Sequence, residues 1–135
     1  MTTISDIKKL YSKQGFGKTL YAYFRFWEYP RLVRIEEFLP RTGTIIDLGS
    51  GYGIFSNYVA GRSSKRQVLA LEFDKKKTEI AKKAAKTGRI NNITFDNKDI
   101  TKIPIKKASA VVIMHVLHHL KSYEEQEKLI GECIK

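Results

Sequence analysis

The stretch IIDLGSGYG, residues 45–53, decides the fold of this chain. It opens with a short apolar run that favours a buried strand, and it continues with Gly49, Gly51 and Gly53. Glycine lets the backbone turn sharply and approach a ligand closely, because it has no Cβ. A helical pattern resumes over residues 54–60, so we predict a strand, a glycine turn and a helix in succession.

The alternation of strands and helices continues beyond this turn. Apolar patterns predict a strand over residues 44–48, further strands over 67–72, 92–96 and 108–114, and helices over 74–86 and 122–135. Asp74 and Ser122 are suited to begin these helices, Ser122 in a capping box with Glu125, and Gly88 is suited to end the first. This order predicts an α/β fold, a Rossmann-like three-layer sandwich with a mainly parallel sheet of about four strands. Ligands of such sheets bind at the carboxyl ends of the strands.

Composition limits the class of protein. The chain has 135 residues, enough for one domain, and 42% of them are hydrophobic, enough for a core. Its single cysteine, Cys133, excludes an internal disulfide and fits a reducing compartment. We find neither a secretion signal nor an apolar stretch of membrane-spanning length, so we expect a cytoplasmic protein.

The net charge of +11 admits two interpretations, and its densest part is residues 62–89. The first is a lysine-rich, solvated helix face. The second is a surface that attracts nucleic acid, anionic lipid or an acidic partner. The helical spacing of these lysines favours the first.

The spacing of the glycines separates the cofactor classes. The dinucleotide fingerprint GxGxxG needs a glycine where this chain has Ile54, which argues against a nucleotide-dependent oxidoreductase, and the lysine of a P-loop is missing. The remaining pattern, acidic-x-Gly-x-Gly-x-Gly with Asp47 at the acidic position, resembles motif I of class I S-adenosylmethionine-dependent methyltransferases. A carboxylate suits the sulfonium and ammonium charges of that donor, whereas it would repel a pyrophosphate.

The resemblance extends to the ends of the next two strands. Glu72 matches the family carboxylate that binds the ribose hydroxyls, and the segment LEFDKKKTEIAKK continues the likeness. Asp99 matches the position that contacts the adenine amino group, with Ile100 on the ring; an ordinary polar loop residue is the alternative for Asp99. The resemblance implies S-adenosylmethionine as cofactor, with S-adenosylhomocysteine as product, held by Asp47, Gly49, Ser50, Gly51, Tyr52, Gly53, Glu72, Phe73, Asp99, Ile100 and His115.

The segment VVIMHVLHHL, residues 111–120, is similar to one found in many small-molecule and lipid methyltransferases. It contains all three histidines, His115, His118 and His119, whose spacing raises the question of a metal site. No HExxH pattern or cysteine cluster accompanies them, and the resemblance accounts for them without metal, so we expect none. His115 is our candidate general base, with a packing role as the alternative.

Residues 1–43 are expected to form a helical N-terminal extension or lid, and residues 44–135 a partial S-adenosylmethionine-binding domain. An aromatic segment over residues 20–29 predicts a helix that could serve as a lid, as an acceptor pocket or as a peripheral membrane contact. Tyr11 resembles an amino-terminal tyrosine that some relatives place against the cofactor.

The sequence departs from the family at its end. A complete fold has seven strands, whereas this chain ends after the helix that follows the fourth, so it resembles a truncated form. An exposed apolar edge at the fourth strand is unfavourable, and we predict a homodimer that covers it.

The function expected from these observations is methyl transfer from S-adenosylmethionine to an unidentified acceptor. A small molecule or lipid is favoured, and RNA comes second, since only the charge supports it. The alternative is a truncated, non-catalytic module that binds S-adenosylmethionine or a partner protein.

Overall fold

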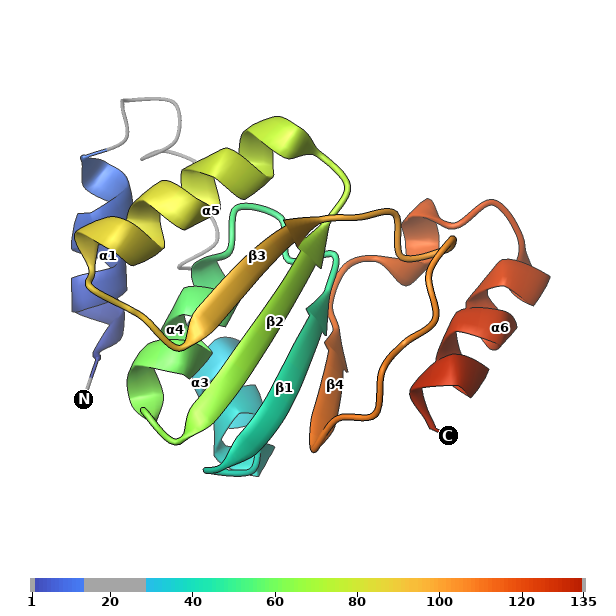
Figure 1. Cartoon of the computed structure of the whole chain (residues 1–135), viewed down its shortest axis with the longest axis horizontal. Helices are drawn as coiled ribbons and strands as arrows, with labels where there is room; N and C mark the ends of the chain where they lie inside the picture. Colours follow the sequence, from blue (N-terminus) through green and yellow to red (C-terminus); the bar gives the residue numbers. More distant parts are fainter. Residues whose placement is uncertain (1, 14–28, 135) are drawn as a thin grey trace.

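A single parallel sheet organises the molecule in a computed structural model that describes residues 2–13 and 29–134 (Figure 1). Its strands lie in the order β3-β2-β1-β4 and comprise β1 (Gly43–Leu48), β2 (Arg66–Glu72), β3 (Ile93–Asn97) and β4 (Ala110–Ile113). Ile45 of β1 is paired with Val68 of β2 on one side and with Ala110 of β4 on the other. All the pairings are parallel, which confirms the predicted α/β sheet.

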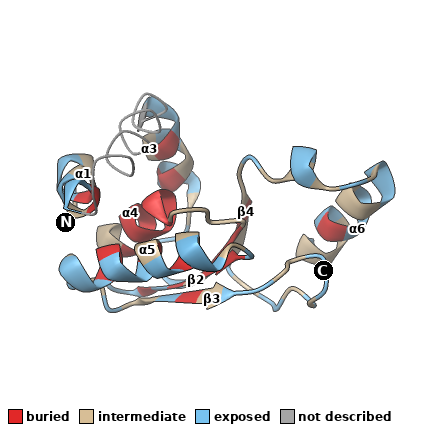
Figure 2. Cartoon of the chain, turned by 90° about the horizontal axis from the view of Figure 1, so that it is seen from above, coloured by how far each residue is buried: buried red, intermediate tan, exposed pale blue. Residues whose placement is uncertain are grey.

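Helices cover the two faces of this sheet unequally (Figure 2). One face carries α1 (Ile4–Ser12), α3 (Tyr29–Phe38), α4 (Ile54–Arg62) and α5 (Lys75–Thr87). The segment after β3, the short 3-10 helix η1 (Leu117–His119) and α6 (Tyr123–Cys133) lie toward the other face. The Rossmann-like arrangement of layers is therefore present.

The side chains of β1 alternate between two hydrophobic clusters, as the period of a strand requires. Ile45 belongs to the cluster of α3 and α4, with Leu32 and Phe55. Ile46 and Leu48 belong to the opposite cluster, which contains Leu129 of α6. Because β1 is buried on both faces, its position in the core is fixed, and so is the position of the glycine turn that follows it.

The helix ends follow the predicted capping chemistry with one correction. Asp74 accepts hydrogen bonds from the amides of Lys76 and Lys77, as an N-cap residue should. Ser122 caps α6, but the carboxylate of Glu125 accepts from the amide of Lys121, so the reciprocal half of the predicted capping box is displaced by one residue. Gly88 ends α5 as predicted, since it is the C-cap residue of this helix.

Gly88 has φ −81°, and the residue after it, Arg89, has φ 52°. The strand predicted over residues 108–114 is shorter in the structure, Ala110–Ile113. The chain leaves the sheet at Met114 because the next residue, His115, has φ 56°, which is incompatible with a strand. The predicted aromatic helix falls largely outside the described residues.

A buried ion pair joins α3 to the first residue of β2. Arg66 is completely buried, and its guanidinium lies 2.6 Å from the carboxylate of Glu36, which is 1% exposed. The same guanidinium donates to the carbonyl groups of Leu39, Pro40 and Val59. A buried guanidinium needs hydrogen-bond acceptors of this kind in place of water.

The first helix is part of the core. Its apolar face brings Ile7 and Tyr11 into a cluster with Ile54, Tyr58 and Ala84 of α4 and α5. A capping box between Thr3 and Asp6 begins α1. The lid role of residues 1–43 stays a prediction. Among the described residues, no helix is long and apolar enough to span a bilayer.

Candidate functional site

The glycine turn crosses from the end of β1 to the end of β2. The amides of Gly49 and Ser50 both donate to the carbonyl of Leu71, at 2.8 and 2.9 Å. The turn is thereby held against the neighbouring strand, at the carboxyl edge of the sheet.

Two of its glycines serve different purposes. Gly53 has φ +71°, and a Cβ there would lie 2.6 Å from the side chains of Ala81 and Phe95, so this glycine permits close packing onto α5 and β3. Gly51 has φ +57°, and a Cβ there would meet no atom within 4 Å. The backbone at Gly51 therefore faces open space, where a ligand can approach it.

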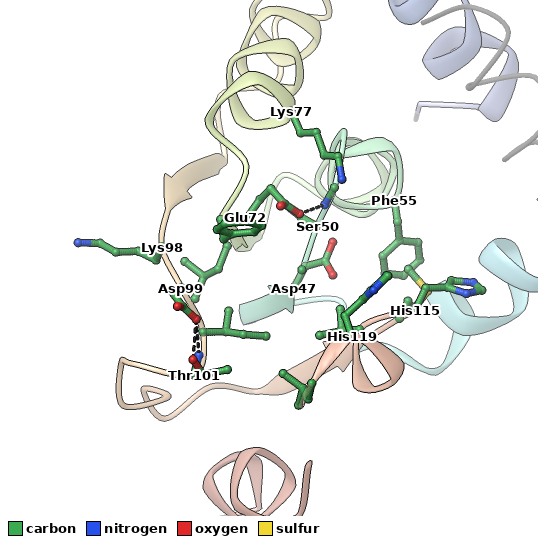
Figure 3. A pocket seen from close by; sticks show the side chains of 18 of the residues that line it. Asp47, Ser50, Phe55, Glu72, Lys77, Lys98, Asp99, Thr101, His115 and His119 are labelled. Carbon is green, nitrogen blue, oxygen red and sulfur yellow. Dashed lines mark hydrogen bonds between the residues drawn. The ribbon is translucent and has the colours of Figure 1, made fainter. Parts of the chain in front are cut away.

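Glu72, at the end of β2, is joined to this turn (Figure 3). Its Oε2 accepts from the Gly51 amide at 2.8 Å, and its Oε1 accepts from the Asp74 amide at 2.9 Å. These donors hold the side chain, which is 7% exposed, at the edge of the cavity described below. Each carboxylate oxygen has a second lone pair for a ligand hydroxyl.

Asp47 and Ser50 supply further polar groups beneath the turn. Asp47 is 3% exposed, and its Oδ2 accepts a 2.5 Å hydrogen bond from Ser56 Oγ. Ser50 Oγ is buried without a hydrogen-bond partner among the residues that the structure describes. A buried hydroxyl of this kind is expected to be satisfied by a ligand or water.

These groups line a cavity of about 680 Å³ at the carboxyl edge of the sheet. Of the residues predicted to bind the cofactor, all except Gly53 line it: Asp47, Gly49, Ser50, Gly51, Tyr52, Glu72, Phe73, Asp99, Ile100 and His115. Gly53 instead packs against Ala81 and Phe95. The roles of these residues toward a ligand stay predictions.

Asp99 is occupied within its own loop. Its carboxylate accepts from the amide and hydroxyl of Thr101 and lies 3.0 Å from Lys102 Nζ. The Thr101 hydroxyl, and then Lys102, hold the pKa of Asp99 below its ordinary value. The side chain is therefore an ionised acceptor at the rim of the cavity, and binding of an adenine amino group has to coexist with these bonds.

Two of the three histidines line the cavity and the third does not. His115 and His119 line the cavity on the side opposite Asp99 (Figure 3). The ring of His118 lies beside that of His119 at a tilt of 42°, with the ring centroids 4.0 Å apart. No group of three or more potential metal ligands occurs among the described residues.

Sequence reasoning missed several residues of the cavity. Leu32 of α3 and Phe55 of α4 contribute apolar surface, and Lys77 of α5 contributes a polar group. Lys77 Nζ lies 5.9 Å from the centre of the Tyr52 ring. The lysine run of α5 gave no signal that distinguished Lys77. His119, which the sequence singles out without assigning it a role in the site, also lines the cavity.

The comparisons with known proteins agree with this geometry. A sequence profile of the family described as "Methyltransferase domain" matches residues 45–135. Ribosomal RNA small subunit methyltransferase G 3 of Bdellovibrio bacteriovorus is 31% identical over 91 residues, which are 67% of this chain and 41% of that protein.

Solved structures show the same fold. Coclaurine N-methyltransferase, bound to N-methylheliamine and S-adenosylhomocysteine, has a TM-score of 0.71 at 21% identity, over 78% of this chain and 32% of that one. A methyltransferase from Geobacter sulfurreducens in complex with S-adenosylhomocysteine has a TM-score of 0.65 at 17% identity, over 78% and 44% of the two chains.

The chain spans about 40% of the length of the curated relatives it matches. The family profile nevertheless covers most of this chain, including the glycine turn, Glu72 and the segment after β4. Together with the four-stranded parallel sheet, this match confirms the resemblance seen in the sequence. The chain therefore belongs to the methyltransferase domain family of S-adenosylmethionine-dependent methyltransferases.

Proposed function

We propose that this chain binds S-adenosylmethionine in the cavity over Gly51 and transfers its methyl group to an acceptor. The observation that carries the proposal is the attachment of the Glu72 carboxylate to the Gly51 amide at 2.8 Å, beside a backbone position that is open to a ligand. This hydrogen bond holds the Glu72 carboxylate, which can accept hydrogen bonds from ligand hydroxyls, beside a glycine that a cofactor can approach closely.

The residues present fit this cofactor. Glu72 can accept from the ribose hydroxyls, and the buried Ser50 hydroxyl needs a partner of the kind that a polar ligand provides. Asp47 places a negative charge near the site of a cationic donor. Ile100 offers an apolar surface to the adenine, and Asp99 an acceptor for its amino group.

The bound cofactor would supply a methyl group already activated on its sulfonium sulfur. The chain has to orient the two reactants and exclude water, and it needs few reactive side chains. His115 lines the cavity and is our proposed base: its imidazole takes the proton that a hydroxyl or amine acceptor loses.

A small molecule or lipid is the acceptor we favour, from the resemblance of residues 111–120 to the corresponding segment of such enzymes. RNA comes second. It is supported by the net charge of +11 and by the relative whose name specifies ribosomal RNA. A chain that binds the cofactor without transferring methyl groups is the alternative function.

Calorimetric titration of the purified chain tests the proposal. We expect micromolar binding of S-adenosylmethionine and S-adenosylhomocysteine, no comparable binding of NAD, and a Kd raised about 5- to 100-fold in Glu72→Ala through lost hydrogen bonds. Glu79→Ala is the matched control, because Glu79 is a carboxylate of α5 that is 58% exposed and lies outside the cavity lining.

The outcomes separate the alternatives. Absence of binding by both ligands contradicts the proposal. Binding followed by transfer of labelled methyl to one of a panel of lipid, small-molecule or RNA acceptors supports the enzyme, and a loss of rate in His115→Ala supports the base. Binding with no transfer to any acceptor favours the non-catalytic module.

A further inference from the structure

The hydroxyl of Tyr11 reaches from the first helix to the glycine turn. It donates a 2.6 Å hydrogen bond to the main-chain carbonyl of Tyr52, which stands between Gly51 and Gly53. Tyr11 is 1% exposed and does not line the cavity. Its contact with the site is therefore made through the main chain of the turn.

A second hydrogen bond fixes the direction of this hydroxyl. Nδ2 of Asn57, a fully buried residue of α4, donates to the Tyr11 oxygen at 2.9 Å. The same amide nitrogen lies 3.4 Å from the carbonyl of Ala81 in α5. Because Asn57 donates to the Tyr11 oxygen, the Tyr11 proton is directed toward Tyr52.

The network joins four elements around one carbonyl. The tyrosine comes from α1, the asparagine from α4, the carbonyl of Ala81 from α5, and the receiving carbonyl from the turn. The residue before Tyr52 gives its amide to Glu72, so the turn is held from both sides. Removal of the Tyr11 hydrogen bond would leave the turn held by Glu72 at Gly51 but no longer held by Tyr11 at the Tyr52 carbonyl.

We infer that Tyr11 is a positioning residue: its hydroxyl fixes the Tyr52 carbonyl and thereby orients the Gly51 amide and Glu72 for the cofactor. The inference rests on the proposed function, since the turn is useful in this orientation only if it binds S-adenosylmethionine. It assigns to α1 a part in the site that differs from direct contact with the ligand.

The test compares Tyr11→Phe with Ile7→Val. Tyr11→Phe keeps the buried ring and removes only the hydroxyl. Ile7 lies one turn earlier on the same helix, is fully buried in the same cluster and makes only apolar contacts through its side chain, so Ile7→Val perturbs the docking of α1 without touching the hydrogen bonds. Both variants are measured at a temperature where each is fully folded.

We expect Tyr11→Phe to raise the Kd for S-adenosylmethionine about 5- to 20-fold, as loss of an oriented hydrogen bond allows, and Ile7→Val to change it less than about twofold. In the ligand-free chain, amide hydrogen exchange at Gly51 and Gly53 should accelerate about tenfold in Tyr11→Phe and remain unchanged in Ile7→Val.

Equal exchange rates in Tyr11→Phe and the wild type would overturn the inference, as would a Kd that both variants raise alike. Failure of the proposed function looks different, because then the wild type itself does not bind the cofactor. The exchange measurement still decides whether Tyr11 holds the turn in that case.

Discussion

Glu72 Oε2 and the amide of Gly51 are joined by a 2.8 Å hydrogen bond, so the end of β2 and the turn after β1 form one unit. A carboxylate that accepts from two main-chain amides makes charge-assisted bonds, which are stronger than neutral ones. The same group that we propose as a cofactor ligand therefore also shapes the turn.

Glu72→Gln should consequently lower the free energy of unfolding by about 1–2 kcal/mol, because the amide side chain keeps the shape and loses the charge. Urea denaturation measures the change. The control is Glu79→Gln, at an exposed carboxylate of α5, for which we expect less than about 0.5 kcal/mol. Equal effects in the two variants would count against a structural role for Glu72.

Gly53→Ala should destabilise the chain by about 2–4 kcal/mol, because it combines a left-handed backbone with a Cβ that overlaps Ala81 and Phe95. Gly131→Ala is the matched variant: its Cβ meets nothing within 4 Å on α6, and alanine should stabilise that helix by up to about 1 kcal/mol. Thermal unfolding of the pair gives opposite signs if the described packing is correct.

Arg66→Ala should cost about 3–5 kcal/mol, because it leaves the Glu36 carboxylate buried near the bottom of the sheet without its closest cation. Arg41 contacts the same carboxylate from a side chain that is 52% exposed, so Arg41→Ala should cost less than about 1 kcal/mol. A similar loss of stability in both variants would show that burial does not determine the contribution of these pairs.

Cys133, the single cysteine, should react slowly with a disulfide reagent in the folded chain. Burial, and then the charge of Glu132, raises the pKa of its thiol above the ordinary 9.0. The folded state thus holds the thiol proton more tightly than the unfolded state, and its contribution to stability is complete below pH 9 and is lost as the pH rises through the higher folded value. The pH dependence of the reaction rate should have its midpoint above 9.0, and a lower midpoint contradicts the assignment.

The outer edge of β4 should mediate self-association, as we propose from its position at the end of the sheet, where no described strand pairs with it. Light scattering should detect a homodimer at micromolar concentration. Tyr123→Lys, which alters the exposed side of α6, should leave the dimer intact if strand pairing forms it. A stable monomer at micromolar concentrations would contradict this proposal.

The features of the fold that could be predicted from the sequence are those determined by residues close together in the chain. The glycine turn, the strands on either side of it and the Asp74 cap each follow from residues close together in the chain. The collection of distant residues around one cavity followed from the rule that parallel strands end at the same edge.

The missed features depend on contacts between distant segments. Glu36 looks like a solvated residue of a surface helix, and its burial depends on cations from distant positions, above all Arg66, 30 residues later in the chain. The hydrogen bonds of Tyr11 to Tyr52 and Asn57 join residues 41 and 46 positions apart, so no local pattern predicts them. The early end of β4 depends on the left-handed backbone of His115, for which a β-strand pattern gives no warning.

The position of β4 has a consequence for how the molecule assembles. The pairs β1–β2 and β2–β3 join strands that are consecutive in the chain, but β4 returns from beyond β3 to pair with β1. Closure of that long loop is entropically slow, so we expect β4 to join a three-stranded nucleus late. Met114, His115 and Val116 follow it into the cavity wall, so ligand capture becomes possible only after this last docking event and can report its completion in refolding kinetics.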